Sequence, residues 1–345
     1  MHEWKLFTEE SGTFIMKIPP KWFYKHLKDK EQHAFEMNSK RVGAFIVSVR
    51  NVSAVSTQYM NFMKLPIQPY NEKVKFIETS IPDENWAFFL WFARVKNYAI
   101  TCSYTINAKV LASKLGKSQL DYARKSIEAF VVIDPVLRQN VLAYEYFDKF
   151  LSSFVAAIDL SNHAVDSDSH IELMVLLAGR VDAALRLLIV LKQQINKGTY
   201  EFDRHLLRQL ETDKKITERQ IYTLARAEEL ISQELFNRLN EAYTIRNKIV
   251  HRYIISDIKT RDVIYVVGEY FSINDALNDA FEKYENLQKS TNKGFYGEEY
   301  PILGFAPPMS INIIREKVKE KHLVKSLNRR ISIKKLDTTD GHNAK

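Results

Sequence analysis

The sequence predicts a multidomain protein in which an α+β region, residues 1–134, precedes an all-α helical bundle at residues 135–290. Three observations support this fold class. Apolar residues alternate in short runs before residue 134, they recur at helical spacing after residue 135, and a basic extension follows at 291–345. A chain of 345 residues exceeds one ordinary core, so more than one domain is expected. The basic extension is expected to be partly disordered.

The first region is predicted to be an antiparallel sheet with a closing helix. Alternating apolar residues indicate strands at 12–18, 42–49 and 98–106, and the run at 86–95 is apolar on both faces, which is typical of a covered central strand. Lys96-Asn97, between the last two strands, predicts a tight hairpin turn.

The closing helix and the domain boundary follow. Leu120, Ala123, Ile127 and Phe130 recur at helical spacing. Asp134-Pro135 marks the boundary, because a residue before proline is driven out of the helical conformation. Trp22, Trp86 and Trp91 are interpreted as core aromatic residues.

The bundle is predicted from apolar stripes and helix caps. Stripes within 147–158 and 173–191 indicate two helices, Thr217 and Gln220 resemble a capping box, and a further helix runs from Ser232 into the Arg246 region. A short extended piece is expected at 263–267, and a last helix is expected to begin at Ser272.

Composition restricts the function classes. The net charge of +8 is compatible with a polyanionic partner such as RNA. A single cysteine, Cys102, excludes an intrachain disulfide and a multi-cysteine zinc site. The sequence contains no P-loop, no Gly-x-Gly-x-x-Gly and no Gly-x-Ser-x-Gly, so neither nucleotide hydrolysis nor serine-hydrolase chemistry is supported, and no cofactor is expected. No metal is expected, because the spacing matches no known metal loop among the candidate ligands Asp159, His163, Asp166, Asp168 and His170. Neither a signal peptide nor a membrane span is apparent, and a cytoplasmic protein is expected.

The residues with most chemical potential lie at the end of the fourth predicted helix. The run from Ile245 to Tyr253 reads Ile-Arg-Asn-Lys-Ile-Val-His-Arg-Tyr. Histidine suits proton transfer near neutral pH, and the planar guanidinium of arginine suits a phosphate and its developing charge. We therefore assign His251 the general acid/base role, Arg246 the electrostatic role, and Asn247 a supporting role in orienting substrate or histidine.

This run resembles the signature of HEPN ribonucleases (higher eukaryotes and prokaryotes nucleotide-binding). Four residues separate Arg246 from His251, and one residue separates His251 from Tyr253. The tyrosine resembles that of the HepT toxins, and Val181 to Arg186 is similar to the family's second helix. The resemblance covers roughly residues 135–290. It implies a metal-independent endoribonuclease that uses attack by the ribose 2′-hydroxyl, at a composite site built by both chains of a homodimer.

The resemblance also implies partners and a biological setting. A toxin–antitoxin or antiviral growth-arrest role is expected, with RNA as substrate and an antitoxin or a nucleotidyltransferase as partner. Tyr253 is the implied acceptor of a nucleotidyl group. Two alternatives stay open: a non-catalytic HEPN module that binds nucleotide, RNA or protein, and a structural dimerisation protein.

The N-terminal region resembles the PsbP-like α+β fold. The matching features are the run from Gly12 to Pro19 with the following Trp22, the later hairpin, and a closing helix that ends near Val132. This likeness is an order of elements, so no functional residue is transferred from it. In the nuclease hypothesis this region senses a signal or positions a target.

Overall fold

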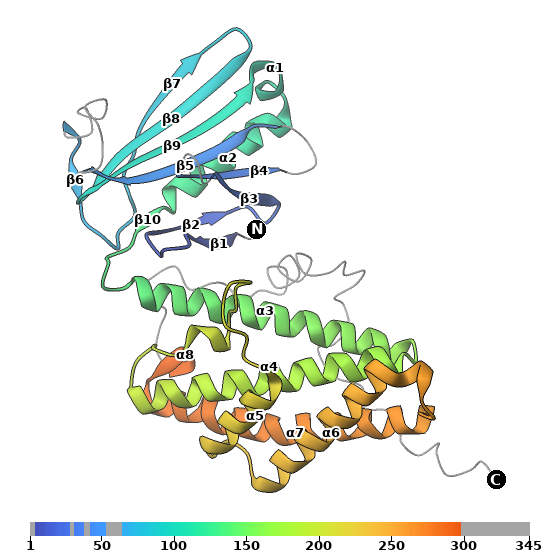
Figure 1. Cartoon of the computed structure of the whole chain (residues 1–345). Helices are drawn as coiled ribbons and strands as arrows, with labels where there is room; N and C mark the ends of the chain where they lie inside the picture. The colour runs from blue at the N-terminus through green and yellow to red at the C-terminus, as the bar shows by residue number, and fades with distance from the viewer. Residues whose placement is uncertain (1–3, 28–30, 38–41, 53–63, 298–345) are drawn as a thin grey trace. The chain divides into compact units, whose positions relative to one another are not determined.

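A computed structural model describes residues 4–27, 31–37, 42–52 and 64–297 (Figure 1). It has a sheet-rich N-terminal part followed by a helical part. Contacts within the chain separate two compact units, one ending at Leu142 and the other beginning at Ala143, which we call the N-terminal unit and the helical unit. The division falls inside a helix, shortly after the Asp134-Pro135 pair. Within the described ranges, no helix has the length and apolarity that a membrane crossing requires.

The N-terminal unit contains two sheets. The smaller one has the order β1-β2-β10. The larger one has the order β3-β4-β5-β9-β8-β6, with β7 also paired to β8 (Figure 1). The strands are β1 (Lys5–Thr8), β2 (Phe14–Ile18), β3 (Trp22–Leu27), β4 (Gln32–Met37), β5 (Ala44–Asn51), β6 (Ile67–Gln68), β7 (Ile77–Pro82), β8 (Trp86–Val95), β9 (Tyr98–Asn107) and β10 (Val131–Val132).

The predicted hairpin is confirmed. β8 and β9 are antiparallel with Val95 opposite Tyr98, and Lys96 takes a φ of 49°, the left-handed conformation that a tight hairpin turn requires. One prediction about β8 is wrong: Trp86, expected in the core, is 46% exposed, because it begins the strand at the sheet margin. Trp22 and Trp91 are buried as expected.

Two helices follow β9. The short α1 (Ala108–Leu111) leads into α2 (Lys114–Glu128), the predicted closing helix, which Ser113 caps by accepting a hydrogen bond from the Gly116 amide. Leu120, Ala123 and Ile127 of α2 are buried in the core of this unit. The predicted helix end near Val132 is wrong: α2 ends at Glu128, Phe130 lies beyond it, and Val131–Val132 forms β10, which pairs with β2. The indole of Trp22 donates a buried hydrogen bond of 2.7 Å to Gln119, which ties β3 to the helix.

A buried histidine is expected to make the stability of the N-terminal unit depend on pH. His33 on β4 is 7% exposed, its Nδ1 lies 3.0 Å from the Tyr24 hydroxyl, and burial lowers its pKa, with Glu9 opposing. A lowered folded-state pKa means that the stabilisation is complete above the unfolded-state value, about 6.5, and is lost as the pH falls through the folded-state value.

We therefore expect the urea midpoint of the N-terminal unit to fall between about pH 7 and pH 5, and His33→Gln to flatten that dependence. Tryptophan fluorescence isolates this unit, because all 4 tryptophans lie at or before Trp91. If the urea midpoint depends on pH equally in the His33→Gln variant and in the unmodified protein, the assignment to His33 is contradicted.

The helical unit is built around α4. Its elements are α3 (Arg138–Asp166, whose start belongs to the N-terminal unit), α4 (His170–Lys197), η4 (Arg204–Leu206), α5 (Glu218–Ala227), α6 (Gln233–Arg252), η5 (Tyr253–Ile255), α7 (Thr260–Thr291) and α8 (Gly294–Gly297). α4 is apolar around most of its circumference, which is typical of a helix covered on several sides.

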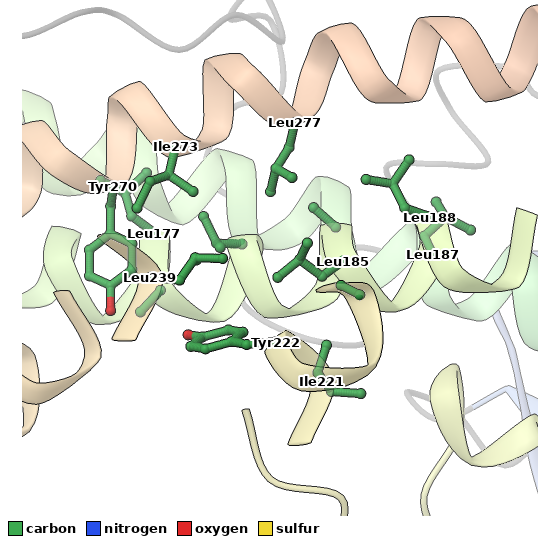
Figure 2. Packing of buried hydrophobic residues seen from close by; sticks show 14 of the residues in the cluster. Leu177, Leu185, Leu187, Leu188, Ile221, Tyr222, Leu239, Tyr270, Ile273 and Leu277 are labelled. Carbon is green, nitrogen blue, oxygen red and sulfur yellow. The ribbon is translucent and has the colours of Figure 1, made fainter. Parts of the chain in front are cut away.

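The core places α5, α6 and α7 against α4 (Figure 2). Leu177 and Leu185 of α4 lie among Tyr222 of α5, Leu239 of α6 and Tyr270 of α7, all of them buried. This packing fixes α5 and α6 relative to each other, which decides the geometry of the candidate site.

The predicted first residue of the last helix is wrong. The segment 263–267, expected to be extended, lies inside α7, which begins at Thr260 rather than at Ser272. Val263, Val266, Val267 and Tyr270 are buried at helical spacing, so packing against the core overrides the strand preference of valine. The predicted basic extension lies outside the described residues from residue 298 onward.

Candidate functional site

Arg246 lies on the inward face of α6. Leu239, Ala242 and Ile249 are the buried residues of this helix. Arg246 follows Ala242 by four positions and precedes Ile249 by three, so it shares their face. Its side chain is only 12% exposed. A charge in that position needs partners within the protein.

Three residues surround the Arg246 guanidinium. Nη1 donates to both carboxylate oxygens of Glu218, each at 2.8 Å. Nε and Nη2 donate to Oδ1 of Asn247 at 3.2 and 2.7 Å. The guanidinium carbon lies 4.8 Å from the centre of the Tyr243 ring, within the range of a cation–π contact. Asn247 therefore orients Arg246, whereas the sequence had suggested substrate or histidine.

Glu218 is positioned by the start of α5. Thr217 caps this helix and, with Gln220, forms the predicted capping box, which is confirmed. The Oε2 atom of Glu218 also accepts a hydrogen bond of 3.1 Å from the hydroxyl of Tyr222, which is fully buried one turn later. The carboxylate is thus fixed by its own helix as well as by Arg246.

An ion pair on α4 anchors the segment that leads into α5. Arg186 Nε donates to Asp182 at 2.7 Å, and Arg186 Nη2 donates to the carbonyl of Ile216 at 2.9 Å. Both side chains are less than one-fifth exposed. This contact holds the chain just before Thr217, so it places Glu218 opposite α6.

Burial and charge set the ionisation of these groups. Burial alone would lower the pKa of Arg246, but the hydrogen bond and charge of Glu218 outweigh it and raise that pKa. Burial raises the pKa of Asp182, with Arg186 opposing, and it raises the pKa of Tyr270 to about 12, with the Arg246 charge opposing. Arg246 and Glu218 therefore form a charged pair in which the arginine stays protonated.

His251 and Tyr253 occupy a different environment. His251 lies in the last turn of α6 and is exposed, and no described residue hydrogen-bonds to its side chain. α6 ends at Arg252, so the helix does not continue to Tyr253, which begins η5 and is 42% exposed. The structure thus brings Arg246 and Asn247 together and leaves His251 and Tyr253 facing solvent.

Exposed apolar side chains surround His251. We call Val250, Tyr253, Ile254 and Ile255 the α6 apolar surface; they are 46, 42, 95 and 81% exposed. Four exposed apolar side chains thus lie within the six positions that also contain His251.

Three residues of the site were not predicted from the sequence: Glu218, Tyr222 and Arg186. The capping box located Glu218 at a helix start, where an acidic residue is common for reasons of helix stability alone. Its pairing with Arg246, 28 residues away, depends on how α5 and α6 pack. Across the described part of the chain, no three His, Cys, Asp or Glu side chains are grouped so that they could hold a metal.

Comparisons with known proteins leave the family open. No protein-family model matches the chain, and no curated protein matches it. One solved structure, from Bacteroides thetaiotaomicron VPI-5482, is similar over 52% of this chain and 78% of its own, with 13% sequence identity and a TM-score of 0.28. A TM-score of that size supports no conclusion about fold or function.

Proposed function

We propose that the helical unit is a metal-independent endoribonuclease of the HEPN type, with Arg246 and His251 as its reacting groups. The observation that carries the proposal is the arrangement on α6. Arg246 is fixed by Glu218 and Asn247, and the unpaired imidazole of His251 is exposed five residues further along the helix.

The two side chains suit different parts of phosphodiester cleavage. An exposed imidazole is accessible to substrate, and histidine suits proton transfer near neutral pH, so His251 can give a proton to the leaving 5′-oxygen. Arg246 Nη2 gives one hydrogen to Asn247, and each Nη nitrogen carries two. The second hydrogen supports a contact to a phosphate oxygen.

A second copy of the chain completes the site in this proposal. His251 lies among the residues of the α6 apolar surface, so an isologous contact across that surface places two copies of His251 near one two-fold axis. Burying the exposed side chains of Ile254 and Ile255 also provides the apolar area that favours association. RNA is then cleaved where the two α6 ends meet.

Activity of point variants tests the proposal. Arg246→Ala and His251→Ala should each reduce cleavage of RNA in the presence of chelator by about 100-fold or more, because each removes a group that acts in the transition state. Arg252→Ala is the matched control, since this arginine is exposed and adjacent. Equal rates in all four proteins would contradict the assignment.

One observation favours a binding module as the second candidate. Glu218 already balances the charge of Arg246, which reduces the stabilisation that this arginine can give to the charge developing in a transition state. A non-catalytic module would retard RNA or nucleotide in a gel-shift assay without producing fragments. Binding without cleavage, weakened by Arg246→Ala, would select this candidate.

A further inference from the structure

A small pocket lined by both apolar and polar side chains lies on one face of the large sheet in the N-terminal unit, and it is unrelated to the proposed nuclease. Side chains of a strand alternate between its two faces. Val47, Cys102 and Trp91 belong to the face buried in the core, so their strand neighbours point to the opposite face. That face holds a pocket of roughly 160 Å³.

The pocket is lined by residues of β4, β5, β9 and β8. These four strands are adjacent in the sheet (Figure 1). The register places Ser48 of β5 opposite Thr101 of β9, and Thr101 opposite Phe92 of β8, so these three side chains form one row across the sheet. In the adjoining rows Ser103 pairs with Ile46 and Arg50 with Ala99. Gln32 of β4 completes the lining. Directly opposed residues have Cβ atoms about 5 Å apart, so one small molecule can contact several of them.

Four uncharged polar side chains of this pocket have unused hydrogen-bonding capacity. No described residue hydrogen-bonds to the side chains of Gln32, Ser48, Thr101 or Ser103. Ser48 is nevertheless only 9% exposed. Hydroxyl and amide groups that converge on a concave surface without a protein partner are the orienting groups of a ligand site.

Charge and apolar lining identify the ligand class. Arg50 contributes a positive charge, and no acidic side chain is among the described residues that line the pocket, which disfavours a cation. Phe92, Ile46 and Ala99 present apolar surface, which favours an organic body over a bare inorganic ion. We propose that this pocket binds a small monocarboxylate with an apolar body, with Arg50 and the hydroxyl groups of Thr101 and Ser103 holding the carboxylate and Phe92 contacting the body.

Calorimetric titration of the full chain with benzoate tests the proposal, with benzylamine as the cationic probe of the same shape. Benzoate should bind with a dissociation constant of about 10 mM or lower, and benzylamine should show no binding. Arg50→Gln and Thr101→Val should each weaken benzoate binding by about ten-fold or more, since each removes a hydrogen bond to a charged group. Thr101→Val preserves shape and strand preference, so it stays informative if Arg50→Gln fails to fold.

Arg124→Gln is the matched control. Arg124 lies on α2 and pairs with Glu78, away from the pocket lining, so this variant should bind benzoate as the unmodified chain does. Absence of benzoate binding, equal binding of benzylamine, or unchanged binding by folded Thr101→Val would each overturn the proposal. None of these outcomes bears on RNA cleavage.

Discussion

Replacing Glu218 with alanine is expected to destabilise the helical unit by about 2–4 kcal/mol, because it leaves a half-buried guanidinium without its counter-charge. The Arg246 side chain is 12% exposed and that of Glu218 is 26% exposed, so solvent compensates only part of the loss. The substitution also removes the acceptor of the buried Tyr222 hydroxyl. The measurement is urea unfolding followed by helical circular dichroism.

Glu241→Ala provides the control for this experiment. Glu241 is exposed on α6, so its removal should change the unfolding free energy by no more than about 0.5 kcal/mol. The double variant Glu218→Leu with Arg246→Met should recover most of the loss, since it removes both charges together. A Glu218→Ala protein as stable as Glu241→Ala would show that the pair has no structural role.

Replacing Arg180 is the second substitution with a large expected effect, and it should stabilise the helical unit rather than destabilise it. It lies on α4, it is 2% exposed, and its Nε and Nη1 atoms have no hydrogen-bond partner among the described residues. Its guanidinium carbon is 5.9 Å from the centre of the Phe154 ring, and burial lowers its pKa to about 10. Arg180→Met is therefore expected to stabilise the helical unit by about 1–3 kcal/mol, because methionine fills similar space without a buried charge.

Arg252→Met is the matched substitution at an exposed position and should leave the unfolding free energy nearly unchanged. If Arg180→Met instead lowers stability by more than about 1 kcal/mol, the arginine has an anionic partner in solution, and the unpaired description is wrong.

Local patterns in the sequence were sufficient for several elements. The hairpin of β8 and β9 follows from alternation on both sides of Lys96-Asn97, and α5 follows from Thr217 and Gln220. In each case the decisive contacts join residues close in sequence, where propensity and period determine the conformation.

Elements decided by distant contacts were not predictable in the same way. In the larger sheet β5 pairs with β9, and in the smaller sheet β2 pairs with β10, so both registers depend on strands far apart in the sequence. The segment 263–267 was predicted to be extended, although it lies within α7, where the buried residues Val263, Val266, Val267 and Tyr270 have helical spacing. Burial against the core decides between strand and helix for this segment.

The candidate site also contains residues that the sequence predicts and residues that only the packed structure brings together. Arg246 and His251 were selected from their spacing in the sequence, and that spacing is what places them on one helix. The partners that fix Arg246 come from α5, and the segment before α5 is anchored to α4. Those contacts exist only after the bundle is packed, so no local pattern could identify Glu218 as the residue that holds Arg246.

The most direct test of the nuclease proposal uses the substrate. A mixed-sequence RNA and the same RNA carrying a 2′-O-methyl group on every ribose are incubated with the purified full chain in chelator. The account predicts fragments that end in 2′,3′-cyclic phosphate from the unmodified RNA alone, and their loss with His251→Ala. Cleavage of the methylated RNA, or the same fragments from the His251→Ala protein, would contradict it.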